Sequence, residues 1–330
     1  MSLLIHSLLA SCTYLRRSAA VFITLLAVTA SLGAHANDDA SAAHRLVSTD
    51  ASATELLLAL GMQEQLVAID VTSKLPSGSK KLPSVGYHRA LSAEGLLGLK
   101  PTMVVGSEHM GPVAVVDALN KAEVTLVQLP IADSAADLKR NIDQLASALA
   151  LESKGQNLIA KLDAKLAELA AKPLSQERIA FLLAMDPSKL RLAGAGTAGN
   201  ALIDMLDATN VADYNNYRNV SAESLLSMQP TMILVVGRDS DAAVAELVKA
   251  NPLLKHTPAG QNDRIMAVEG GSLVAGLSVS AVDEALRINQ TMHTGQAMHI
   301  SQAVRISHAT NTHDQATSAH DGVAGSGAAR

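Results

Sequence analysis

The side chains best suited to chemistry in this chain stand in a row at Tyr87-His88-Arg89. A tyrosine phenolate is a hard oxygen ligand for ferric iron and serves as a haem axial ligand. Free tyrosine has a pKa near 10, so a neighbouring cation such as Arg89 would help it to ionise. The pattern indicates an iron ligand at Tyr87, with His88 as a competing ligand; the alternative is a surface loop with no such role.

A second pair, Tyr217-Arg218, partly repeats this arrangement. Arg218 stands three residues before Ser221, as Arg89 stands three residues before Ser92. We therefore expect two equivalent cationic loops, which would suit an anionic ligand held between two lobes.

A similar sequence segment occurs twice, at 92–105 and 221–234, and it predicts the elements that position these residues. Each copy contains a short helical stretch beginning Ser-Ala-Glu, then Pro-Thr-Met and an apolar β-run. The copies are about one domain length apart. The repeat predicts two similar lobes.

Helical and strand-like runs alternate within each half, which is typical of α/β lobes with central parallel sheets. We predict an N-terminal lobe at 37–133 and a C-terminal lobe at 173–289. Leucines recur at helical spacing through 134–172, so we expect one long rigid connecting helix there, bent near Gly155. The ligand cleft would lie between the lobes.

Both ends of the chain differ from the lobes. Residues 1–36 have two arginines, an uncharged apolar run and Ala34-His35-Ala36, which predicts a signal peptide cleaved after Ala36 and an exported, periplasmic protein. Residues 290–330 are rich in Ser, Thr and His, and we expect a disordered tail. A metal-binding role for this His-rich tail is one alternative function.

Other classes of function find little support. The net charge is −5 without a basic run, which argues against nucleic-acid binding. A G-x-G-x-x-G match at 194–199 lacks the acidic residue that a dinucleotide site needs about twenty positions later, so we interpret it as a tight turn into a helix. A nucleotide-using enzyme remains the alternative, but no catalytic constellation is visible and we expect no enzyme activity.

Taken in order, these motifs resemble the haem-binding periplasmic substrate-binding proteins of bacterial ABC haem importers. The residues that carry the resemblance are Ser48–Gly61, Pro83–Leu97, Leu99-Lys100-Pro101, the helical stretch after residue 134 and Ala193–Ala198. The resemblance implies two α/β lobes joined by a rigid helix, with haem as the transported ligand. It implies that Tyr87 is the axial phenolate and that Arg89 supports it.

The same resemblance implies further roles. Glu94 and Glu223 match the glutamates that dock on the permease dimer of the inner membrane, one from each lobe. Arg218 and Arg238 are candidates for contacts to the haem propionates. Met185 stands where some relatives carry a histidine, and would be a weak second ligand or an apolar wall.

The resemblance also leaves alternatives within the same class. A siderophore or cobalamin carrier of an ABC importer would share most of these motifs. We expect a monomer that receives its ligand downstream of an outer-membrane haem receptor.

Overall fold

The computed structural model describes residues 44–237, 240–269, 273 and 276–294. The chain divides into two units, Met1–Arg45 and Leu46–Arg330, and almost all described residues belong to the second. The predicted signal peptide, the His-rich tail from residue 295 and Arg238 lie outside the described residues. Within the described ranges, no helix is long and apolar enough to cross a membrane.

The N-terminal lobe is built on a parallel sheet with the strand order β2-β1-β3-β4 among the described residues. Apolar side chains fill this sheet: all five residues of β3 are buried. Buried strands that pair in parallel need helices on their faces. The strands and helices of this lobe are β1 (Leu46–Ser48), α2 (Ala51–Ala59), β2 (Leu66–Ala68), α3 (Ala93–Gly98), β3 (Met103–Ser107), α4 (Val113–Lys121) and β4 (Thr125–Leu129), with a 3-10 turn at Gln63–Gln65.

The turn from β1 into α2 is fixed by a buried aspartate. Asp50 caps α2 by accepting a hydrogen bond from the backbone N–H of Ala53 at 2.9 Å. Its other carboxylate oxygen accepts from the N–H of Ser107 at 2.5 Å, at the end of β3. Burial raises the pKa of the Asp50 carboxyl, although these hydrogen bonds oppose the rise. Asp50 therefore ties together the carboxyl ends of two neighbouring strands.

The C-terminal lobe has a mixed sheet, with the described strands in the order β10-β9-β5-β6-β8 and β7 pairing β5. Strand β6 runs antiparallel to both β5 and β8. The central strands β10, β9 and β5 pair in parallel as predicted, and the antiparallel strands β6 and β8 extend the sheet on one side. Its elements are β5 (Arg178–Leu183), β6 (Leu190–Ala193), α7 (Ala198–Met205), β7 (Thr209–Asn210), β8 (Tyr217–Val220), α8 (Ala222–Ser227), β9 (Met232–Val236), α9 (Ser240–Ala250), a 3-10 turn at Pro252–His256, α10 (Pro258–Gln261), β10 (Ile265–Val268) and α11 (Val279–Thr294).

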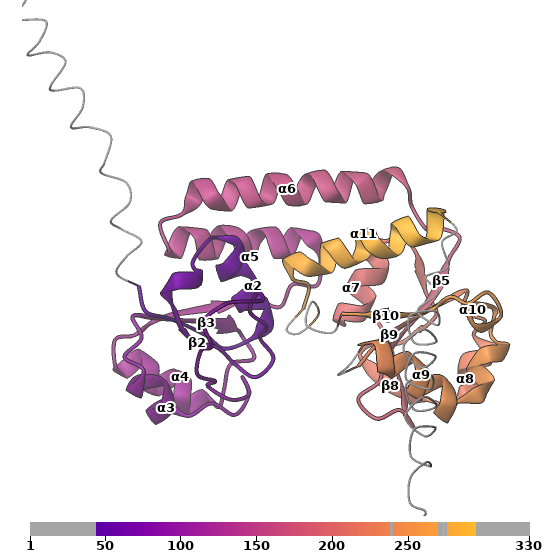
Figure 1. The fold of residues 1–330 in the computed structure, drawn as a ribbon, viewed down its shortest axis with the longest axis horizontal. Helices are drawn as coiled ribbons and strands as arrows, with labels where there is room; N and C mark the ends of the chain where they lie inside the picture. The colour runs from indigo at the N-terminus through magenta and orange to yellow at the C-terminus, as the bar shows by residue number, and fades with distance from the viewer. Residues whose placement is uncertain (1–43, 238–239, 270–272, 274–275, 295–330) are drawn as a thin grey trace, which may run out of the picture. The chain divides into compact units, whose positions relative to one another are not determined.

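The segment 134–172 forms two helices, so the prediction of one long bent helix is wrong. Helix α5 (Ala135–Ala148) and helix α6 (Glu152–Ala171) are joined at residues 149–151, where Ala150 has a φ of 53°. The helices lie side by side in Figure 1. A Cβ atom on Gly155 would come within 2.6 Å of the Cβ of Ala146, so the glycine permits their close approach. Helix α6, about 30 Å long, carries the chain from the N-terminal lobe to the C-terminal lobe.

Helix α11 returns from the C-terminal lobe and lies along α6 (Figure 1). Its Asn289 amide donates to the backbone oxygen of Lys172 at 2.6 Å. At its other end, the backbone N–H of Ser280 donates to Glu55 of α2 at 3.1 Å. The helix continues to Thr294, so residues 290–294, which the prediction assigned to a disordered tail, are helical.

Candidate functional site

Residues 86–91, here called the Tyr87 loop, cross the carboxyl end of the parallel sheet in the N-terminal lobe. On one side, the N–H of Val71, just after β2, donates to the oxygen of Gly86 at 3.0 Å. On the other side, the N–H of Gly111, after β3, donates to the oxygen of His88 at 2.9 Å. Open α/β sheets bind ligands at the carboxyl ends of their strands. The loop therefore stands where a ligand is expected.

Within this loop, neighbouring side chains have opposite exposure. Tyr87 is 46% exposed, whereas His88 is only 4% exposed. The two rings contact each other, with centroids 4.2 Å apart and planes inclined by 47°. Arg89 is exposed and has no carboxylate partner among the described residues. The loop thus presents a phenol and a free cation while its histidine points inward.

A buried carboxylate lies beside that histidine. Oδ2 of Asp70 is 3.9 Å from Nδ1 of His88, and Nδ1 has no hydrogen-bond partner among the described residues. The Asp70 carboxylate accepts from the hydroxyls of Thr72 at 2.7 Å and Ser73 at 2.6 Å. Burial alone would raise the pKa of the Asp70 carboxyl, but His88 and these hydroxyls hold it below its ordinary value. The loop therefore rests on a buried anion.

His109, on the turn after β3, is a further basic group at this end of the sheet. It is half-buried, and it lies close enough to Arg89 for the two charges to interact. Burial, and then the cation of Arg89, lower the pKa of the His109 imidazole, while Glu108 opposes them. The His109 imidazole therefore adds a hydrogen-bonding group beside the Tyr87 loop, as its position after the strand Met103–Ser107 suggests.

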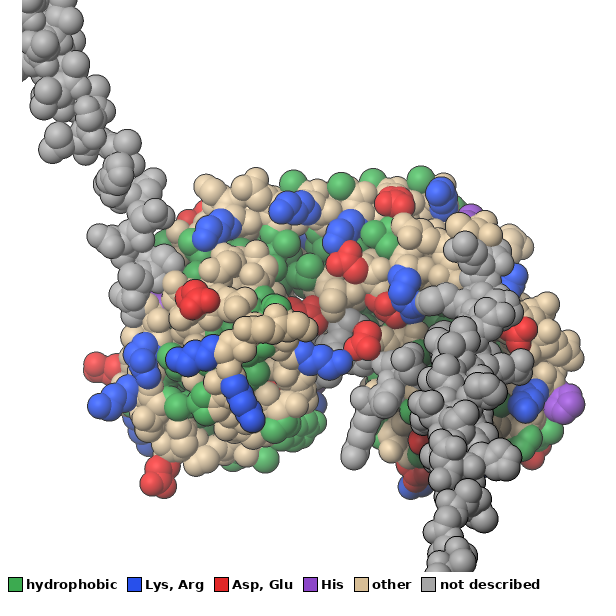
Figure 2. Space-filling model, viewed as in Figure 1, with side chains coloured by type: hydrophobic (Ala, Val, Ile, Leu, Met, Phe, Trp, Pro, Cys, Tyr) green, Lys and Arg blue, Asp and Glu red, His purple; other side chains and the backbone are tan. Residues whose placement is uncertain are grey.

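Exposed apolar side chains gather at the same place. Among the described residues, the large exposed hydrophobic ones are Val71, Tyr87, Val113 and Met185. The first three belong to the Tyr87 loop or to the segments beside it, and Met185 follows the carboxyl end of β5 in the C-terminal lobe. Figure 2 shows Lys and Arg side chains around apolar ones over the N-terminal lobe. At the Tyr87 loop, the apolar surface of Val71, Tyr87 and Val113 is combined with the positive charge of Arg89.

The C-terminal counterpart of the Tyr87 loop is not a loop. Tyr217 and Arg218 begin strand β8, where Tyr217 pairs with Ala193 of β6. Tyr217 packs against the core, and burial raises the pKa of its phenol. The Cζ atom of Arg218 lies 4.6 Å from the centroid of the Tyr214 ring. The expectation of two equivalent cationic loops is therefore wrong: the N-terminal lobe alone presents its tyrosine on a loop.

Glu94 and Glu223 occupy matching positions in the two lobes. Each is exposed in the first turn of a six-residue helix, α3 or α8. A serine caps each helix: Ser92 accepts from the N–H of Gly95 and Ser221 from that of Ser224. The hydrogen bond from its own N–H, followed by that from Ser221, lowers the pKa of the Glu223 carboxyl. Both helices lead through a left-handed residue and a proline into a fully buried central strand, β3 or β9.

Residues 46–269 match the family described as periplasmic binding protein. The chain belongs to the periplasmic binding protein family. Among solved structures, this periplasmic binding protein is similar to the periplasmic haem-binding protein HutB of Vibrio cholerae, with 38% identity and a TM-score of 0.69 over 76% of this chain and 98% of that one. A periplasmic haem-binding protein from Pseudomonas aeruginosa gives 30% identity and a TM-score of 0.69 over 74% and 91% of the two chains.

Curated relatives of this periplasmic binding protein match at lower identity. A vitamin B12-binding protein of Vibrio cholerae is 26% identical over 68% of this chain and 81% of its own length. An ABC transporter substrate-binding lipoprotein of Bacillus subtilis, YvrC, is 23% identical over 58% of this chain. The match spans only 62% of the length of YvrC.

The glycine-rich segment of this periplasmic binding protein serves packing. A Cβ atom on Gly194 would lie 2.0 Å from the backbone oxygen of Tyr214, and one on Gly199 would lie 2.5 Å from the ring of Phe181. The Thr197 hydroxyl caps α7 by accepting from the N–H of Asn200. The prediction of a tight turn into a helix is confirmed.

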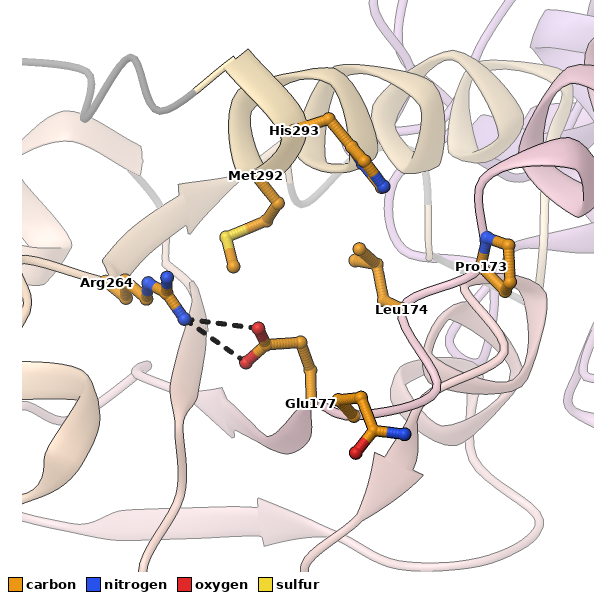
Figure 3. Close-up of a pocket in the computed structure, with 7 residues that line it drawn as sticks. Pro173, Leu174, Glu177, Arg264, Met292 and His293 are labelled. Atoms are coloured by element: carbon orange, nitrogen blue, oxygen red, sulfur yellow. Dashed lines mark hydrogen bonds and ion pairs between the residues drawn. The ribbon is translucent and has the colours of Figure 1, made fainter.

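A small cavity of about 210 Å³ lies away from the Tyr87 loop, at the other end of the C-terminal sheet (Figure 3). Glu177 and Arg264 stand just before β5 and β10, at the amino ends of these strands, and form an ion pair of 3.1 Å. Glu177 also accepts from the hydroxyl of Thr231 at 2.5 Å. None of the predicted ligand-binding residues lines this cavity, so it is distinct from the predicted ligand site. Its lining residues are Pro173, Leu174, Gln176, Glu177, Arg264, Met292 and His293.

Proposed function

We propose that this periplasmic binding protein carries ferric haem to the permease of an ABC importer in the inner membrane. The observation that supports it most is the exposed phenol of Tyr87, held at the carboxyl end of the sheet between exposed valines and beside the free cation of Arg89. Ferric haem combines a hard iron centre, a flat apolar macrocycle and anionic propionates. Each feature finds a matching group at this surface.

Each residue of the site would contact a different part of the haem or support a residue that does. The oxygen of Tyr87 binds the iron, and the positive charge of Arg89 stabilises the phenolate form. His88 is buried beneath Tyr87 and faces Asp70, so we infer that it holds the tyrosine ring in place and does not reach the iron. Met185 provides an apolar contact from the C-terminal lobe, and Arg218 or Arg238 would pair with a propionate. Apart from the reversible coordination of iron by Tyr87, the ligand is carried chemically unchanged, so the protein acts as a carrier and not as an enzyme.

The same protein would receive haem in the periplasm and deliver it to the permease. The protein is exported, its signal peptide is removed after Ala36, and it works as a monomer. Haem would reach it downstream of an outer-membrane receptor. Glu94 and Glu223 would contact the permease dimer, because they stand exposed at the same position of the two lobes.

A haemin titration followed by visible absorption tests the ligand and the iron site together. We expect tight binding with a high-spin ferric phenolate spectrum. The Tyr87→Phe variant keeps the ring that contacts His88 but lacks the oxygen, so it should lose that spectrum and bind haemin at least tenfold more weakly. Identical spectra of the two proteins, or no binding by the unchanged protein, would refute the proposal.

A cobalamin carrier is the second candidate, because curated relatives include vitamin B12-binding proteins. Competition distinguishes the two. A hundredfold excess of cyanocobalamin should leave haemin bound. Displacement of haemin, together with direct cobalamin binding that Tyr87→Phe leaves unchanged, would favour the second candidate.

A further inference from the structure

Two exposed valines lie on either side of the Tyr87 loop. Val71, which follows strand β2, is 61% exposed. Val113, which begins helix α4, is 74% exposed. Single exposed apolar residues are common on protein surfaces. These two valines, however, lie with Tyr87 at the carboxyl end of the sheet in the N-terminal lobe.

Val71 is held outward by its neighbours. Its N–H donates to Gly86, and the carboxylate of Asp70 accepts from the N–H of Ser73 at 2.9 Å and from the hydroxyl of Thr72. These bonds fix the backbone on both sides of Val71. The side chain is therefore presented to solvent by a turn that has little freedom to withdraw it.

Val113 is held outward by helix α4. The buried face of this helix contains Val115 and Leu119, which are four residues apart and so lie on one face. Val113 precedes Val115 by two positions, which turns it to the opposite face. The chain enters the helix from Gly111, whose hydrogen bonds to His88 and Leu91 anchor it to the Tyr87 loop. An ordered backbone thus presents this valine too.

We infer that Val71 and Val113 are contact residues for the apolar face of the macrocycle, one on each side of the Tyr87 oxygen. The inference rests on the proposed function and extends it from the iron to the ring. Burying these side chains under a flat ligand would remove apolar surface from water, which favours binding without any bond to iron. The two valines would then select for a porphyrin over a polar iron chelate that Tyr87 alone could accept.

Metal-free protoporphyrin IX separates ring contacts from iron ligation, because it has no iron for Tyr87 to bind. The variants Val71→Asn and Val113→Asn should each raise the Kd for both haemin and protoporphyrin IX by about three- to tenfold, through lost apolar burial. The haemin spectrum should keep its phenolate signature. Ala160→Asn, an exposed substitution on α6, is the matched control and should change neither Kd. Urea midpoints of the apo proteins establish that all variants fold.

Unchanged affinity for both ligands in either valine variant would overturn the inference for that residue. Weaker binding of haemin alone, with an altered spectrum, would also overturn it, since the valine would then act through Tyr87. If the unchanged protein binds no haemin, the proposed function fails and this inference fails with it. If the unchanged protein binds haemin tightly and neither valine substitution changes the Kd, this inference fails while the proposed function stands.

Discussion

The Asp70 carboxylate and the His88 imidazole face each other 3.9 Å apart beneath the Tyr87 loop, both shielded from solvent. This pair connects the loop to the body of the lobe. From Asp70 the hydrogen bonds continue through Ser73 to Thr54 of α2, and from there to Ser48 of β1. The position of the tyrosine therefore depends on a buried polar network and not on the loop alone.

Removing the charge of Asp70 should destabilise the apo protein and alter its response to acid. We expect Asp70→Asn to lower the free energy of unfolding at pH 7 by about 1–3 kcal/mol, because the half-buried hydroxyls of Thr72 and Ser73 and the buried His88 lose an ionised partner. The pKa of Asp70 is lowered in the folded state, so its contribution is present above its ordinary value of 3.8 and is lost as the pH falls through the folded value. The difference between the two proteins should therefore shrink in acid.

Urea unfolding of both proteins at several values between pH 7 and pH 3 measures this difference. Asp163→Asn removes an exposed aspartate that pairs with Lys139 at 2.8 Å, and it should change the stability by under about 0.5 kcal/mol. A difference between wild type and Asp70→Asn that grows as the pH falls would contradict the assigned sign.

The charge of Arg89 should matter more than its hydrogen-bonding geometry. We expect Arg89→Met to weaken haemin binding by about three- to thirtyfold, because the phenolate and the propionates lose a nearby cation at a partly exposed site. Arg89→Lys keeps the charge and should retain most of the affinity. Titrations of the three proteins with haemin measure this, and equal loss in both variants would assign Arg89 a geometric role instead.

The exposed glutamates should affect delivery and not ligand binding. Glu94→Gln and Glu223→Gln should each leave the haemin Kd unchanged and slow uptake into vesicles that contain the cognate permease. The double variant should be slower than either single variant. Glu152→Gln, which removes an exposed acid in the first turn of α6, is the matched control. Full uptake by the double variant would remove the docking role.

Gly155 should be sensitive to the smallest substitution. We expect Gly155→Ala to destabilise the protein by about 1–3 kcal/mol, because the new methyl group would lie 2.6 Å from that of Ala146. Gly98→Ala, also helical but with nothing within 4 Å of the new Cβ, should be neutral or stabilising. Thermal unfolding measures both. If the clash is the cause, the second substitution Ala146→Gly should restore much of the lost stability.

Local sequence patterns were enough to predict the two-lobe α/β class and the equivalence of the two repeated segments. The helix of each copy and the apolar strand that follows it are found in both lobes as α3–β3 and α8–β9. Local information suffices there, because a capping serine and an unbroken apolar run specify a helix start and a buried strand without distant partners. The same local signals placed Tyr87 on a loop between β/α units.

Contacts between distant segments fix where the helical segment reverses and which tyrosine is exposed. Leucines keep helical spacing on both sides of Ala150, so the pattern does not reveal a left-handed residue between two helices that pack together. Tyr217 belongs to a strand because Ala193, a distant residue, pairs with it, and that pairing also buries it. In the same way, His88 faces inward, where its imidazole lies beside the buried carboxylate of Asp70. Such outcomes depend on contacts between distant segments, which local spacing does not encode.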